Sequence, residues 1–89
     1  MDILILGAAG MVGRKLAEAL LDTGRLGEGE IARLTLFDVV PSDLQSRGAV
    51  AVETRAGDIS DPATVQALVA HRPEVIFHLA AIVSGEAEA

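Results

Sequence analysis

The sequence has 89 residues, a net charge of −6 and no cysteine, which bounds it to one small domain or part of one and excludes a disulfide scaffold, a thiol nucleophile and cysteine-based metal sites. Two phenylalanines are its only aromatic residues and it has no basic stretch, which argues against nucleic acid or an anionic membrane as a partner. No apolar run reaches the ~20 residues that span a bilayer, and the start lacks the basic region of a signal peptide, so we expect a cytoplasmic location.

The first predicted elements are a strand over 2–6 and a helix over 11–23, joined by the turn Gly7-Ala8-Ala9-Gly10-Met11-Val12-Gly13. A strand, a glycine-rich turn and a helix in this order are typical of a cradle for dinucleotide phosphates. Gly7 would allow the tight turn, Gly10 the approach of the backbone to a pyrophosphate, and Gly13 close packing of helix on strand. The first N–H groups of the helix, with Met11 and Val12, would then face the anion. The alternative is an ordinary strand-to-helix turn without a ligand.

Helical spacing predicts which side of the first helix packs on a sheet. The predicted face consists of Val12, Leu16, Ala19, Leu20 and Thr23. Gly24 is a plausible left-handed residue just after the helix. The segment 24–30 contains three glycines and is predicted to be a loop.

The second predicted strand covers 34–38 and ends at Asp38. An acidic residue at this place accepts hydrogen bonds from the ribose hydroxyls of adenosine and repels a 2′-phosphate. The next residues are Val39, Val40 and Pro41, with no cation among them, so the pattern favours NAD over NADP. The alternative is that Asp38 is a turn residue that ends a strand.

Three further elements follow: a strand over 50–54, a helix over 62–71 and a buried strand over 75–79. Either Ser60 or Asp61 is expected to cap the second helix, which would turn Val65, Leu68 and Val69 toward the sheet. The candidate site residues in this half are Asp58, Ile59, Leu79, Ala80 and Ala81. Asp58 and Ile59 follow the third strand, whereas the small residues after the last strand would let a flat cofactor lie against the backbone. Purely structural roles are the alternative for each.

Alternating strands and helices predict an α/β fold with a doubly wound parallel sheet of the Rossmann type. Right-handed crossovers order the four strands 3-2-1-4, with one helix on each face. The candidate residues would then meet at the carboxyl ends of the strands, where such sheets bind ligands. His71 and His78 have no metal-ligand spacing, so no metal site is predicted, and His78 is expected to be a structural residue in a buried strand.

Together these motifs resemble the extended short-chain dehydrogenase/reductase family, which includes NAD-dependent epimerases and dehydratases of nucleotide sugars. The segments 34–41 and 76–89 are most similar to its D-erythronate dehydrogenase branch, whose members are often labelled nucleoside-diphosphate-sugar epimerases. The resemblance implies NAD as cofactor, a sugar acid or nucleotide sugar as substrate, and a homodimer of the full protein. It covers only the opening part of a family member.

The resemblance also implies that no catalytic residue lies in this chain. The family uses a Tyr-x-x-x-Lys pair and a Ser or Thr, and this sequence has no tyrosine. Its single lysine, Lys15, lies on the first helix, and Ser84 comes too early to match. We therefore interpret residues 1–89 as the NAD-binding portion of an enzyme whose catalytic and substrate-binding region is absent here. A non-catalytic dinucleotide-binding module is the other interpretation.

Overall fold

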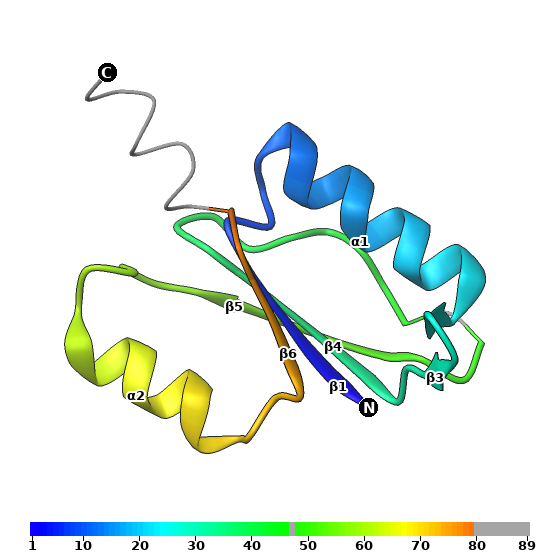
Figure 1. Ribbon diagram of the computed structural model, residues 1–89. Helices are drawn as coiled ribbons and strands as arrows, with labels where there is room; N and C mark the ends of the chain where they lie inside the picture. The colour runs from blue at the N-terminus through cyan, green and yellow to red at the C-terminus, as the bar shows by residue number, and fades with distance from the viewer. Residues whose placement is uncertain (47, 80–89) are drawn as a thin grey trace.

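The computed structural model describes residues 1–46 and 48–79, which form a four-stranded parallel sheet with a helix on either side (Figure 1). The elements in chain order are β1 (Asp2–Leu6), α1 (Met11–Thr23), β2 (Arg25–Leu26), β3 (Gly29–Glu30), β4 (Arg33–Asp38), β5 (Ala51–Ala56), α2 (Pro62–Ala70) and β6 (Val75–His78). The sheet order β5-β4-β1-β6 is the one predicted for the four parallel strands. The doubly wound α/β prediction is therefore confirmed. In the described part of the chain no helix is long and apolar enough to cross a membrane.

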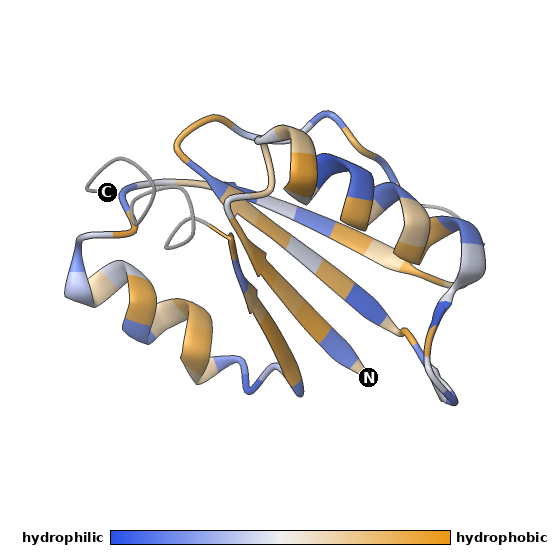
Figure 2. Ribbon diagram, turned by 45° about the horizontal axis from the view of Figure 1, so that its top comes forward, coloured by the Kyte–Doolittle hydropathy of each residue, from blue (hydrophilic) through white to orange (hydrophobic). Residues whose placement is uncertain are grey.

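The central strand β1 supplies both layers of the core because its side chains alternate between the two faces of the sheet. Ile3 and Ile5 belong to the larger cluster under α1, together with Leu34 and Leu36 of β4. The smaller cluster on the other face consists of Leu4, Leu6, Phe37 and Leu68. Figure 2 shows β1 as apolar over most of its length, as expected for a strand that is covered on both sides.

The predicted packing face of α1 was right in part: Leu20 is buried and Leu16 packs against the core, whereas Ala19 and Thr23 are exposed. The buried residues are Gly13, Ala17, Leu20 and Leu21, whereas Val12 is 68% exposed. Small residues at Gly13 and Ala17 let the helix backbone approach the sheet closely. The prediction from helical spacing favoured large apolar side chains and so missed the small buried residues Gly13 and Ala17. Gly24 does end the helix in the left-handed conformation, with φ of 68°.

The segment after α1 is a short hairpin and not the loop that we predicted. β2 and β3 pair antiparallel, with Arg25 opposite Glu30 and Leu26 opposite Gly29. Gly27 takes a positive φ of 61° in the turn between them, which glycine adopts without steric cost. Leu26 packs against the core under α1, and this burial gives the hairpin a reason to form.

The strand β6 is half-exposed, which corrects the prediction of a buried strand. Ile76 is 45% exposed and His78 is also exposed, while Val75 and Phe77 pack against the core under α1. β6 stands at the end of the sheet order in the described residues, so its second face has less cover than that of β1. On α2, Leu68 is buried as predicted, but Val69 is 47% exposed.

The helix α2 is capped by Asp61, whose Oδ1 accepts a hydrogen bond of 3.0 Å from the backbone N–H of Ala63. We expect Asp61→Ala to lower the free energy of unfolding by about 1 kcal/mol, because a donor of the first turn loses its acceptor. Asp61→Asn keeps an acceptor at this place and serves as the control. Urea denaturation of both variants measures the difference. Equal stability of the alanine variant and the wild type would show that the cap contributes nothing.

Candidate dinucleotide-binding site

The glycine-rich turn leaves β1 at the carboxyl end of the sheet and is tied to the neighbouring strand. The N–H groups of Gly7 and Ala8 both donate to the carbonyl oxygen of Phe37, at 2.8 and 3.1 Å. Gly7 has φ of 94°, a conformation that L-residues with a side chain rarely adopt. A Cβ on Gly13 would overlap the carbonyl oxygen of Gly7 and lie 2.9 Å from Cα of Ala8. Two of the three glycines are therefore required by the geometry of the chain itself.

Gly10 differs from the other two glycines because the chain leaves room for a side chain there. A Cβ on Gly10 would lie 3.6 Å from the nearest atom, the carbonyl oxygen of Gly7, which is an ordinary contact. Its backbone has φ of −70° and ψ of 165°, which any residue can adopt. A glycine that the fold does not need fits a place where a ligand approaches the backbone.

The first turn of α1 is open to an anion. Gly10 is the N-cap, and among the described residues no side chain caps this helix. The first N–H groups, including those of Met11 and Val12, have no acceptor within the helix. Met11 and Val12 are 75% and 68% exposed, so the start of this helix lies at the surface of the described chain. Donors and helix dipole together make this turn suitable for phosphate.

Asp38 lies at the end of β4, beside the glycine-rich turn, and holds that turn in place. Its Oδ2 accepts a hydrogen bond of 2.9 Å from the N–H of Ala9, and its Oδ1 accepts one of 2.6 Å from the N–H of Val39. Each carboxylate oxygen has a second acceptor site that ribose hydroxyls could use. The structure thus brings Asp38 and the turn together, as the sequence predicted.

Asp58 and Ile59 follow β5 at the same edge of the sheet. Oδ1 of Asp58 accepts hydrogen bonds from the backbone N–H and the hydroxyl of Ser60, at 2.9 and 2.7 Å. These bonds hold the pKa of Asp58 below its usual range. The side chain of Ile59 packs against the smaller core cluster, so a ligand would meet its backbone. Gly57 N–H donates to the carbonyl oxygen of Asp38 at 3.0 Å, which links this segment to β4.

The strand register brings the candidate residues to one edge. Leu6 pairs with Phe37 on one side and with His78 on the other, and Asp38 pairs with Ala56. The glycine-rich turn, Asp38 and the Asp58 segment therefore share the carboxyl edge. Leu79 follows β6 there and packs against the core under α1. Ala80 and Ala81 lie outside the described residues.

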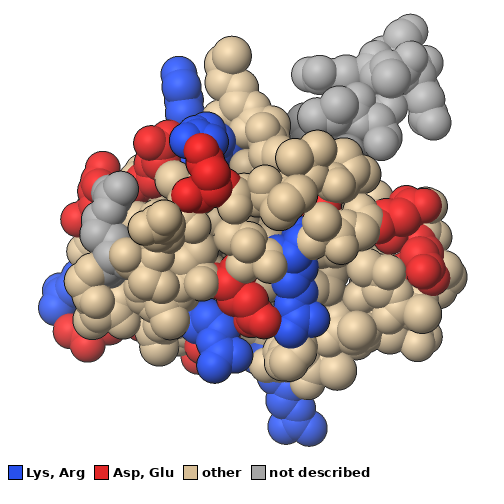
Figure 3. Space-filling view, turned by 180° about the vertical axis from the view of Figure 1, so that it is seen from behind, with Lys and Arg blue, Asp and Glu red and all other residues tan. Residues whose placement is uncertain are grey.

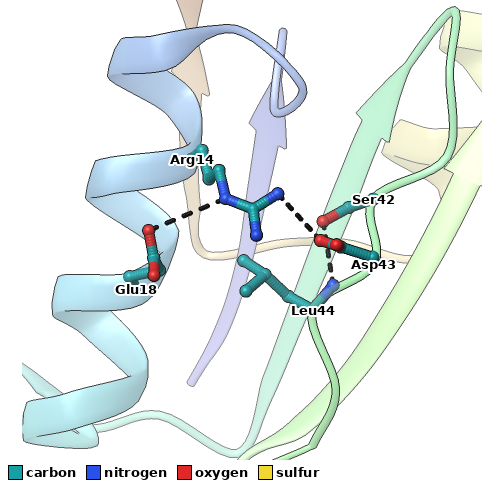
Figure 4. Close-up of polar contacts among 5 residues, drawn as sticks. All are labelled: Arg14, Glu18, Ser42, Asp43 and Leu44. Atoms are coloured by element: carbon teal, nitrogen blue, oxygen red, sulfur yellow. Dashed lines mark hydrogen bonds and ion pairs between the residues drawn. The ribbon is translucent and has the colours of Figure 1, made fainter.

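One feature of this edge was not predicted: a cation from α1 lies beside the loop that follows Asp38. Nη1 of Arg14 is 2.8 Å from Oδ1 of Asp43, and its Nε is 3.8 Å from Oε1 of Glu18 (Figure 4). The residues directly after Asp38 in the sequence include no cation. Helical spacing pairs Arg14 with Glu18, but the contact with Asp43 spans 29 residues and has no local signal.

The rest of the described surface offers little that points to another binding site. Seen from behind, acidic and basic side chains are interspersed and form no continuous basic patch on that face (Figure 3). An open hollow lined by Met1, Thr23, Gly24, Arg25 and Ile31, among others, lies at the opposite end of the sheet from the glycine-rich turn. The described residues contain no group of three His, Asp or Glu that could hold a metal ion.

Comparisons with known proteins agree on one group of enzymes. Residues 3–89 match the NAD dependent epimerase/dehydratase family. A D-erythronate dehydrogenase from Cupriavidus necator is 45% identical over 93 residues, which cover 100% of this chain and 28% of that protein. The crystal structure of the nucleoside-diphosphate-sugar epimerase from Agrobacterium tumefaciens superposes with a TM-score of 0.81 at 46% identity, over 88% of this chain and 23% of that one. This chain thus spans about a quarter of the length of these relatives.

Proposed function

The chain belongs to the NAD-dependent epimerase/dehydratase family, and from this we propose that residues 1–89 form the NAD-binding portion of a sugar-acid dehydrogenase of the D-erythronate type. The observation that carries the proposal is Asp38, which is hydrogen-bonded to the glycine-rich turn at the carboxyl edge. The Asp38 carboxylate would bind the ribose, and it also holds the glycine-rich turn that would bind the pyrophosphate. The likeness to a D-erythronate dehydrogenase over the whole chain supports the substrate class.

The geometry of the described residues supports the proposed contacts with pyrophosphate and ribose. Gly10 lets the pyrophosphate reach the backbone, and the first N–H groups of α1, with Met11 and Val12, bind its oxygens. Asp38 accepts hydrogen bonds from the adenosine ribose. The remaining proposed contacts are Asp58, Ile59 and Leu79, which the described structure holds at the carboxyl edge, and Ala80 and Ala81, which are proposed from the sequence alone.

NAD held at this site would supply the hydride acceptor for oxidation of a hydroxyl-bearing carbon of the substrate. The part of the protein described here binds and orients the cofactor, and we place the proton-transferring residues in a region beyond this chain. The sequence has no tyrosine that could serve as the family's base. A cytoplasmic location and a homodimer of the full protein stay predictions.

A second candidate function is an epimerase or dehydratase of nucleotide sugars, which the likeness to the Agrobacterium tumefaciens structure favours. Both functions need the same cofactor site, because hydride transfer begins each reaction. Purified enzyme from the complete native gene, given D-erythronate and NAD, distinguishes them through NADH absorbance. Net formation of NADH supports the dehydrogenase. Conversion of a nucleotide sugar without net NADH supports the alternative.

The cofactor site itself is tested at Gly10. We expect Gly10→Val to weaken NAD binding at least tenfold, about 1.4 kcal/mol, because the new side chain stands where the pyrophosphate approaches. Isothermal titration of the protein from the complete native gene measures the affinity, and far-UV circular dichroism checks the fold.

Gly10→Ser is a second variant that separates an effect on NAD binding from an effect on stability. Serine is a good N-cap, so its hydroxyl should bond the first turn of α1 and leave stability unchanged or slightly higher. It should still weaken NAD binding, because it occupies donors that the phosphate needs. Full NAD affinity in both folded variants would show that the turn is not the phosphate cradle.

A further inference from the structure

An ion pair between Arg14 and Asp43 joins α1 to the loop after Asp38. Arg14 lies in the first turn of α1, where its N–H donates to the carbonyl oxygen of the N-cap Gly10 at 2.9 Å. Its guanidinium reaches across to Asp43 at 2.8 Å (Figure 4). Each residue is therefore only a few positions from the proposed dinucleotide site.

The loop between Asp38 and Asp43 is held at both ends. At the start, Oδ2 of Asp38 accepts from Ala9. At the far end, Leu44 packs against the core under α1, and its N–H donates to the hydroxyl of Ser42 at 3.2 Å. Val39 and Val40 lie between these anchors and are 71% and 58% exposed. The guanidinium of Arg14 therefore contacts one end of this loop, and Asp38, the residue proposed to bind ribose, is at the other end.

We propose that Asp43 is a specificity-determining residue, because it withholds the guanidinium of Arg14 from the 2′-phosphate of NADP. This inference rests on the proposed role of Asp38 in binding ribose. A guanidinium is the side chain best suited to bind phosphate, through two parallel hydrogen bonds. Here it is engaged by Asp43 and lies near Glu18, so its charge is already balanced. A 2′-phosphate would meet Asp38 without a free cation to offset it.

The charge state of the pair is consistent with this role. The hydrogen bond to Arg14 lowers the pKa of Asp43, and the same bond raises the pKa of Arg14. Both groups stay ionised near neutral pH. The pair is also exposed, with side-chain exposures of 47% for Arg14 and 74% for Asp43, and exposed pairs contribute little to stability. Replacing Asp43 should therefore redirect Arg14 without unfolding the protein.

The test is titration of NAD and NADP into the protein from the complete native gene, as wild type and as Asp43→Asn. We expect Asp43→Asn to tighten NADP binding about fivefold to tenfold, or about 1.0–1.4 kcal/mol, and to change NAD affinity less than twofold. The double variant Arg14→Gln/Asp43→Asn should return NADP affinity to the wild-type value. Glu28→Gln removes the same charge from an exposed residue in the hairpin turn and should change neither affinity.

Each outcome decides a different point. Wild type that binds NAD, with no gain in NADP affinity on Asp43→Asn, overturns the inference and leaves the proposed function standing. A gain that persists in the double variant also overturns it, because Asp43 would then act through its own charge and not through Arg14. Wild type that binds neither dinucleotide refutes the proposed function, and the inference with it.

Discussion

Gly13→Ala should lower the free energy of unfolding by about 2 kcal/mol, although alanine is the better helix former. A Cβ at this position overlaps the carbonyl oxygen of Gly7 and lies 2.9 Å from Cα of Ala8. Both atoms belong to the backbone of the turn, so α1 has to move away from the sheet. Overpacking of this kind costs about 3 kcal/mol at the upper end of its usual range. The gain in helix propensity offsets about 1 kcal/mol. Guanidinium chloride denaturation measures the difference.

Gly10→Ala is the matched control, because it adds the same methyl group three residues earlier in the same turn. Its Cβ meets nothing closer than 3.6 Å, so only the weaker N-cap preference of alanine, about 1 kcal/mol or less, should be lost. The two variants together distinguish Gly13, which the fold needs, from Gly10, which we assign to the ligand. Equal stability of Gly13→Ala and wild type would show that α1 can shift without cost, and would contradict the close packing of α1 on the glycine-rich turn.

Asp38→Ala should weaken NAD binding more than NADP binding and so narrow the preference between them. The variant loses the proposed hydrogen bonds to the ribose hydroxyls, and bonds to a charged group contribute about 1.5–3 kcal/mol each. It also removes the negative charge that a 2′-phosphate would meet. NAD affinity should therefore fall at least tenfold, while NADP affinity falls less or rises. Titration calorimetry with both dinucleotides gives the two dissociation constants.

The same substitution removes the acceptor for the N–H groups of Ala9 and Val39, so its effect on the turn has to be measured separately. Asp38→Asn retains one acceptor oxygen but no charge, and should fall between wild type and Asp38→Ala in its preference for NAD. Glu28→Ala removes an exposed carboxylate from the hairpin turn and should leave the preference unchanged. Wild-type protein that binds NADP as tightly as NAD would contradict the role given to Asp38.

Local signals in the sequence were sufficient for most of the fold. The bounds of β1 and α1 agree with the prediction, because the apolar run ends at Gly7 and the helix ends at Gly24. Both glycines take a positive φ, a conformation that glycine adopts without steric cost. The strand order also followed, since short right-handed connections leave few alternatives. β5 runs two residues further than predicted, because pairing with β4 continues to Asp38 and Ala56.

Tertiary contacts decided the details on which the proposed preference for NAD over NADP rests. The hydrogen bond from Ala9 to Asp38 and the ion pair of Arg14 with Asp43 each join residues that are 29 positions apart. Groups so far apart in the sequence meet only after β1 and β4 pair and α1 folds back over them. The packing face of α1 was decided in the same way, since closeness to the turn selects Gly13 over Val12. The sequence by itself therefore determined the strand, turn and helix of the proposed dinucleotide cradle, through backbone sterics and apolar periodicity. Only the folded chain determined which charges surround that cradle, because their positions depend on contacts between distant segments.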